Sequence, residues 1–253
     1  RILSVRSIVL TPADDMDTWI KFANLCRKSG RMVLAEKTLN SLLGPDAHQA
    51  MDAPLAPKAP PAVIYSHLKF MWACGARAES LSYLRDFTAN LAEDLGMAAV
   101  DEQQNLVMPD MRAAPRLADF ARLLARCYFK LGEWQVAMNE EWVIDETYDV
   151  ILSYKRATEL DRAWYKAWHA WALANFDVIT HHERRGEAIP FHEVAASIVP
   201  SVQGFFRSIA LASGNSLQDT LRLLTLWFKF GHLEHVADAV RPGCGPGSVD
   251  AGV

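Results

Sequence analysis

The chain has 253 residues, of which 51% are hydrophobic and 22% are charged. This apolar content is too high, and the net charge of -4 too small, for a largely disordered protein, and the length suffices for one large domain or a repeat array. The slight acidic excess argues against a dedicated nucleic-acid binder, which usually carries a clear basic excess.

The cysteines exclude two common frameworks. Cys26, Cys74, Cys127 and Cys244 are far apart in sequence, so they form neither a CxxC zinc motif nor the dense pattern of a disulfide scaffold. The first three lie among apolar residues and are predicted to be small buried side chains. We predict no membrane span, because the best apolar run, residues 194–206, is too short and contains a proline.

The first helical pattern lies between Asp17 and Leu43. Apolar residues recur there at helical spacing on both sides of a break at Ser29 and Gly30. This pattern predicts two helices joined by a tight turn. Asp17 or Thr18 could cap the first helix, and Gly30 could supply the left-handed residue that ends it.

The same pattern recurs along the chain, with a tryptophan or other large residue, a small residue, a glycine before the second helix and an alanine within it. Tetratricopeptide units of about 34 residues have this layout. It predicts an all-α fold, a solenoid of tetratricopeptide-like hairpins, and an unrelated helical bundle is the alternative. The matching positions are Trp19, Ala23, Gly30, Ala35; Leu68, Met71, Gly75, Leu84; Ala125, Tyr128, Gly132, Trp134, Ala137; Tyr154, Ala157, Trp168, Ala172; and Leu224, Trp227, Gly231, Val236.

Three segments interrupt the helical repeat region, which we assign to residues 1–240. They lie near residues 45–62, which include a proline-rich stretch, near 96–115, where periodic apolar residues are few, and near 181–192, which are charged. We expect linkers or loops there. The Gly- and Pro-rich residues 241–253 are predicted to be a flexible tail.

No catalytic motif of the common nucleotide-binding, hydrolase, metalloprotease or kinase classes is present in the sequence. His232 and His235 could share a helix face, but a third metal ligand is not evident, so a solvated face is favoured over a metal site. The run of Trp164, Trp168 and Trp171 has the spacing of one helix face. It favours a packed core over a platform for stacking bases.

Two pairs of cations are more informative. Arg122 and Arg126 are four residues apart, as are Arg162 and Lys166, so each pair could project from one helix face and meet an anion. Opposing charges are expected nearby, and candidates are Asp119, Glu159 and Asp161. On spacing alone, solvated salt bridges are favoured over a polyanion pocket.

Several longer motifs carry a family resemblance. The segments 131–134 (LGEW), 157–171 (ATELDRAWYKAWHAW), 202–208 (VQGFFRS) and 217–228 (LQDTLRLLTLWF), in this order, resemble the FAT domain of target-of-rapamycin (TOR) kinases, members of the phosphatidylinositol-3-kinase-related group. The resemblance runs from about residue 6 to 240. It implies a solenoid that passes from tetratricopeptide-like into HEAT-like repeats and clamps a kinase domain.

The resemblance also implies a setting. TOR kinases phosphorylate serine and threonine in nutrient and growth signalling, within complexes that contain Raptor- or Rictor-type subunits and a WD-repeat propeller subunit. We therefore expect this chain to act in the cytoplasm, and at endomembranes or in the nucleus through the parent complex, without nucleic acid. ATP and magnesium would bind only in the parent's kinase domain, which this sequence does not contain, so the chain itself is expected to be non-catalytic with no required cofactor.

The resemblance also implies a ligand, because TOR FAT domains hold inositol hexakisphosphate in a pocket lined by lysine and arginine. The positions of this chain that match are Lys69, Arg122, Arg162 and Lys166, with Arg126 and Arg31 as weaker candidates. The leading expectation is thus a regulatory and scaffolding segment with a structural polyanion. Two alternatives stay open: a free-standing tetratricopeptide adaptor that binds peptide segments, and a helical enzyme with an unrecognised site.

Overall fold

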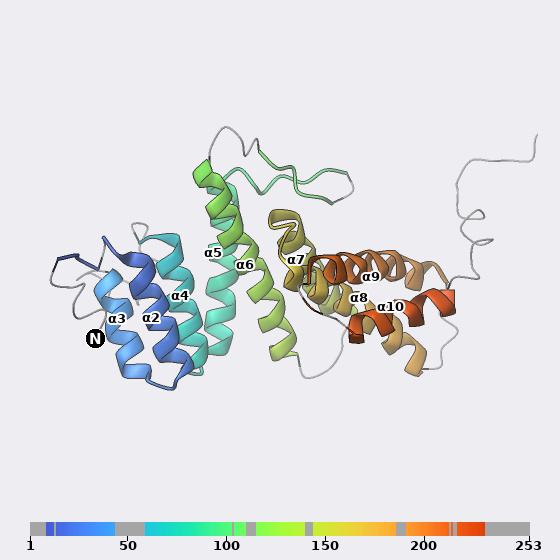
Figure 1. Cartoon of the computed structure of the whole chain (residues 1–253), viewed down its shortest axis with the longest axis horizontal. Coiled ribbons are helices and arrows are strands. Elements are labelled where there is room, and N and C mark those ends of the chain that lie inside the picture. Colours follow the sequence, from blue (N-terminus) through green and yellow to red (C-terminus); the bar gives the residue numbers. More distant parts are fainter. Residues whose placement is uncertain are drawn as a thin grey trace, which may run out of the picture. The chain divides into compact units, whose positions relative to one another are not determined.

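The computed structural model describes residues 9–12, 14–43, 59–102, 104–109, 115–139, 144–185, 191–212, 214 and 217–230. Over these residues the regular elements are α-helices, joined by turns and by one loop that contains an isolated antiparallel bridge (Figure 1). The prediction of an all-α protein is confirmed. Contacts divide the chain into two compact units, Arg1–Arg162 and Ala163–Val253, each of which is described by itself.

The first unit opens with the predicted hairpin, formed by α2 (Met16–Lys28) and α3 (Met32–Leu43). Gly30 lies between the helices with φ of +76°, a conformation that favours glycine. The start of α2 differs from the prediction, because the residue before the helix is Asp15 and not Asp17 or Thr18. The Thr18 hydroxyl donates a hydrogen bond to the Asp15 carboxylate, at 2.7 Å.

The core of this hairpin consists of residues that the repeat pattern singled out, together with their helical neighbours. Ala35 is fully buried and Ala23 nearly so, which lets the two helix backbones approach closely. The side chain of Phe70, from the next helix, joins the same cluster. The buried members of this cluster are Ala23, Cys26, Ala35, Leu39 and Phe70.

The second hairpin consists of α4 (Pro61–Ala73) and α5 (Arg77–Asp94), and Gly75, with φ of +100°, again lies at the turn. Most of the proline-rich linker lies outside the described residues, but Pro61 already occupies the first turn of α4. Proline is well tolerated there, because the first N–H groups of a helix have no intrahelical acceptor. The predicted linker therefore ends earlier than residue 62.

The third hairpin corrects the repeat pattern. The pattern places Gly132 before a second helix, whereas α6 (Pro115–Met138) continues through it, and the partner helix is α7 (Ile144–Leu160). A Cβ atom at Gly132 would lie 2.7 Å from Cε1 of Tyr154 on α7. This glycine therefore makes room for an aromatic ring between two helices and does not end a helix.

The helices of the first unit pack mainly against their neighbours in sequence, from α2 to α7, as expected of a solenoid. Figure 1 shows these helices side by side, with the loop of residues 97–109 that follows α5 extending past α6 toward α7. The described residues of this region form no helix, and Val100 and Leu106 form an antiparallel bridge within it.

The second unit contains α8 (Tyr165–Arg185), α9 (Phe191–Leu211) and α10 (Leu217–Phe230). A Cβ atom at Gly204 of α9 would lie 2.7 Å from Cβ of Ala172 on α8, so these helices are in close contact. Asp219 fixes α10 to both helices through Ser208 of α9 (3.2 Å) and His169 of α8 (2.9 Å). The core of the unit includes Ala172, Ile179, Phe205 and Leu226.

The charged linker predicted near residues 181–192 is shorter than expected. Helix α8 continues to Arg185 and α9 begins at Phe191, so residues 181–185 are helical. Glutamate and arginine are good helix formers, and charge alone does not end a helix. The HEAT-like character of this C-terminal part stays a prediction.

Trp171 is buried and Trp168 and Trp164 are half-buried, with the rings of Trp168 and Trp171 5.8 Å apart, which confirms packing for this tryptophan run. Cys26 and Cys127 are buried as predicted, whereas Cys74 is exposed, because it lies just past the end of α4.

His232, His235 and the predicted tail lie outside the described residues. None of the helices described is long and apolar enough to cross a membrane.

Candidate anion-binding site

Lys69 of α4 is the predicted ligand residue that the structure places in a partly buried position among other cations. Its side chain is half-buried, and its Nζ lies 4.1 Å from the centre of the Tyr65 ring one turn earlier. The Tyr65 hydroxyl in turn donates a hydrogen bond to the carbonyl oxygen of Arg126 on α6, at 3.1 Å. This contact fixes α4 against α6 at the level of Lys69.

Three further cations lie near enough to Lys69 to affect the pKa of its ammonium group. Arg27 comes from the last turn of α2, and Arg126 and Lys130 come from α6, where they are four residues apart and share a face. Burial and, in this order, the charges of Arg27, Lys130 and Arg126 lower the pKa of Lys69 to about 8. We call these four residues the Lys69 cluster.

A carboxylate of the protein neutralises part of the positive charge of this cluster. Lys130 pairs with Glu133, one turn later on α6. The Nε atom of Arg27 is buried and has no hydrogen-bond partner among the described residues. Side chains from α2, α4 and α6 thus bring together several positive charges and hydrogen-bond donors, a combination suited to an anion with several charges.

Arg122 lies one turn before Arg126 but has a different environment. Its side chain is 59% exposed and its guanidinium pairs with Asp119 at 2.9 Å, so the expectation of an opposing charge from Asp119 is confirmed. Glu159, the second expected partner, pairs instead with Arg156 at 3.4 Å and Lys155 at 3.7 Å.

The pair of Arg162 and Lys166 does not have the geometry that its spacing predicted. Arg162 lies in the turn after α7, whereas Lys166 is the second residue of α8, so the two do not project from one helix face. Both side chains are exposed. Arg162 ends the first unit and Lys166 belongs to the second. Their role as polyanion ligands, and that of Arg122, stays a prediction.

Comparison with known proteins identifies the family. The FAT domain profile matches residues 1–225, which is most of the chain. The chain belongs to the FAT domain family. It is 40% identical to the serine/threonine-protein kinase TOR2 of Saccharomyces cerevisiae over 96% of its length, and 38% identical to tor1 of Schizosaccharomyces pombe over 95%. It is 36% identical to mTor of Drosophila melanogaster over 96%.

This FAT chain spans about a tenth of the length of those kinases, with 11%, 10% and 10% of each covered. The resemblance recognised from the sequence motifs is thereby confirmed. The names of these relatives describe serine/threonine-protein kinases.

Sequence reasoning missed Arg27 and Lys130 and ranked Arg126 below Arg122. A signal for Lys130 was available, because it follows Arg126 by four residues and Lys69 was already assigned to the site. Arg27 could not be predicted from helical spacing, since only the packing of α2 against α4 brings it near Lys69.

The described residues of the FAT chain contain no group of three or more His, Cys, Asp or Glu side chains that could hold a metal ion.

Proposed function

We propose that this chain is a non-catalytic regulatory and scaffolding segment of a TOR-type serine/threonine protein kinase that acts in nutrient and growth signalling. The observation that carries the proposal is the FAT match over residues 1–225, together with identity of 36–40% to TOR kinases. The segment clamps the kinase domain and supports assembly with Raptor- or Rictor-type subunits and a WD-repeat propeller subunit. It works in the cytoplasm, and at endomembranes or in the nucleus through the parent complex, and ATP and magnesium bind only to the kinase domain.

The test is binding in trans. The purified chain is immobilised and titrated with a separately expressed TOR kinase domain, and kinase activity is measured with and without the chain. We expect saturable binding and a changed rate of substrate phosphorylation, and no phosphate transfer from ATP by the chain alone. Saturable binding of peptide segments with no affinity for the kinase domain would favour a free-standing adaptor instead.

We further propose that the Lys69 cluster is the centre of an inositol hexakisphosphate pocket, with Arg162, Lys166 and Arg122 as further predicted ligands. The proposal is supported by the convergence of cations from three helices and by the low proton affinity of Lys69. Clustered cations repel one another, and a polyphosphate would relieve this repulsion and accept strong charge-assisted hydrogen bonds. Such a ligand would also hold α2, α4 and α6 together.

Calorimetric titration with inositol hexakisphosphate at two salt concentrations tests this site. We expect Lys69→Gln to weaken binding by about tenfold, the loss typical of one charge-assisted contact. Lys37→Gln, which removes an exposed lysine of α3 outside the cluster, is the matched control and should bind like wild type. Single reversals of Arg122, Arg162 and Lys166 decide their roles one by one. Equal affinity of wild type and Lys69→Gln would contradict the assignment.

A further inference from the structure

A second concave site lies in the first unit, apart from the Lys69 cluster. It is a cavity of about 370 Å³ between α5, α6, α7 and the loop of residues 97–109, and it shares no residue with the cluster. Its volume lies within the range of small-ligand sites, which begins at about 300 Å³. Much of its wall is apolar, formed by alanine and leucine side chains that include Ala89, Ala92, Ala98, Leu106, Leu131 and Leu152.

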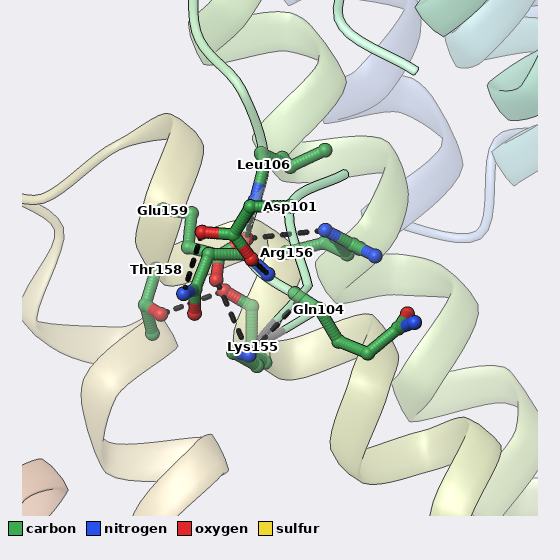
Figure 2. Close-up of polar contacts among 8 residues, drawn as sticks. Asp101, Gln104, Leu106, Lys155, Arg156, Thr158 and Glu159 are labelled. Atoms are coloured by element: carbon green, nitrogen blue, oxygen red, sulfur yellow. Dashed lines mark hydrogen bonds and ion pairs between the residues drawn. The ribbon is translucent and has the colours of Figure 1, made fainter. Parts of the chain in front are cut away.

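The loop wall is held in place by polar contacts to α7. The backbone N–H of Leu106 donates to the Glu159 carboxylate at 3.1 Å, and Lys155 Nζ donates to the carbonyl oxygen of Gln104 at 3.0 Å. Within the loop, Asp101 accepts hydrogen bonds from the backbone N–H and the side-chain amide of Asn105 (2.7 and 3.0 Å). Figure 2 shows these contacts gathered where the loop meets the end of α7. The cavity is therefore bounded by a docked loop.

A buried cation lines this cavity. Arg156 of α7 is only 7% exposed, and its ion pair with Glu159 is a long contact of 3.4 Å. The same carboxylate also serves Lys155 and the N–H of Leu106, so one negative charge faces two positive charges. A guanidinium carries five N–H donors, and a buried cation needs most of them satisfied. Arg156 lines the cavity, and among the described residues the hydrogen-bond partner of its guanidinium is Glu159 (Figure 2), which leaves donors for a ligand.

Two neutral groups add donors to the same wall. Tyr128 is half-buried, and burial raises the pKa of its hydroxyl, which keeps the proton available for donation. Gln135 is buried and accepts a hydrogen bond from the Ser153 hydroxyl through Oε1 at 3.3 Å, which leaves its NH₂ group as a donor. No hydrogen bond to another described residue uses the Tyr128 hydroxyl or this NH₂ group.

The charged residues of the lining limit the charge that a ligand can carry. The lining also includes the exposed residues Arg85, Glu93 and Asp149, and with Arg156 the four formal charges cancel. A single negative charge can approach the donors of Arg156 and Arg85. A phosphate dianion or polyphosphate would meet the carboxylates of Glu93 and Asp149 and be repelled.

From these observations we propose that the cavity binds a small monocarboxylate with an apolar body. The carboxylate accepts hydrogen bonds from Arg156, Tyr128 and Gln135, and the apolar body contacts the leucine and alanine wall. This site is independent of the proposed regulatory function, since it rests only on the geometry of the first unit.

The test is a titration of the full 253-residue chain, labelled with ¹³C in its alanine and leucine methyl groups and observed by NMR. Three probes have unbranched six-carbon skeletons and differ in their polar group: hexanoate, neutral hexanamide and hexyl phosphate. We expect hexanoate to shift the methyl signals of the cavity wall, including Ala89, Ala98 and Leu106. Hexanamide and hexyl phosphate should bind at least about fivefold more weakly, because one lacks the charge and the other carries too much.

Variants localise the site. Ala89→Leu fills the cavity from its exposed rim and should abolish the shifts, whereas Ala78→Leu, the same change at an exposed alanine of α5 outside the lining, should leave them unchanged. Tyr128→Phe should weaken hexanoate binding by about threefold to tenfold, the loss of one hydrogen bond. Equal binding of hexanoate and hexanamide, shifts that survive Ala89→Leu, or no shift of the cavity methyls with hexanoate would each overturn the proposal.

Discussion

Replacing Lys69 by methionine should stabilise the protein in the absence of ligand. Methionine keeps most of the length of the lysine side chain and removes the charge that faces Arg27, Arg126 and Lys130. The pKa of Lys69 falls from its ordinary value of 10.5 to about 8. Since a tenfold change in a dissociation constant corresponds to about 1.4 kcal/mol, holding Lys69 charged at neutral pH costs at most about 3.5 kcal/mol.

The expected gain is smaller than this limit. Lys69 is partly accessible to solvent, which screens its neighbours, and its charge also gains about 0.5–1 kcal/mol from the Tyr65 ring, whose centre is 4.1 Å away. We therefore expect Lys69→Met to raise the free energy of unfolding by about 1 kcal/mol at pH 7. For a chain of this size, that corresponds to a melting temperature higher by about 2–4 °C.

The effect must depend on pH in a fixed direction. Unfolded Lys69 binds a proton up to about pH 10.5 and folded Lys69 only up to about pH 8, so the unfolded state binds more protons between these values. The contribution of Lys69 to wild-type stability therefore rises from pH 8 to 10.5, and the advantage of the methionine variant shrinks there. Other groups near Lys69, including Cys127, are present in both proteins, so only the change in their interaction with Lys69 enters the comparison.

The assay is urea unfolding of wild type and Lys69→Met at pH 7 and pH 10, followed by tryptophan fluorescence. The reasoning is refuted if the variant is less stable than wild type at pH 7, or if the difference between the two proteins is the same at both pH values. Lys37→Met, at an exposed site outside the cluster, should change stability by less than about 0.5 kcal/mol.

Other consequences concern contacts between helices. Gly204→Ala should lower the free energy of unfolding by about 1–3 kcal/mol, because its new Cβ would lie 2.7 Å from that of Ala172, and adding Ala172→Gly should recover part of the loss in a double-mutant cycle. Glu159→Gln should weaken the docking of the 97–109 loop, so amide exchange at Leu106 should accelerate by about tenfold, and unchanged exchange would contradict this role. Asp219→Asn should lower the melting temperature of the second unit, at a cost of about 1–3 kcal/mol, because a buried carboxylate that accepts bonds from α8 and α9 is lost.

The hairpins were predictable because local signals specify them. Apolar spacing and the glycines at 30 and 75 are read directly from sequence, and the structure uses both glycines at positive φ. Gly132 has the same place in the pattern but lies inside α6, because its function is to admit the ring of Tyr154. A glycine that ends a helix and one that admits a neighbouring side chain look alike in sequence, since only tertiary packing distinguishes them.

The candidate site was predictable only in part for the same reason. Helical spacing shows which residues of one helix share a face, and it correctly aligned Arg126 with its neighbours on α6. It does not show which faces of α2, α4 and α6 meet, so it could not place Arg27 near Lys69 or show that Arg122 and Arg126 have different environments. The i,i+4 argument for Arg162 and Lys166 failed because the helix begins only at Tyr165.

The most direct test of the central proposal is a thermal melt of the chain with and without inositol hexakisphosphate at fixed salt. A ligand that binds the folded state must raise the melting temperature by mass action. The account predicts a clear rise for wild type that is strongly reduced in Lys69→Met, although that variant is the more stable protein without ligand. A cooperative melt with no shift, or an equal shift in both proteins, would contradict the proposal that the Lys69 cluster holds a structural polyanion.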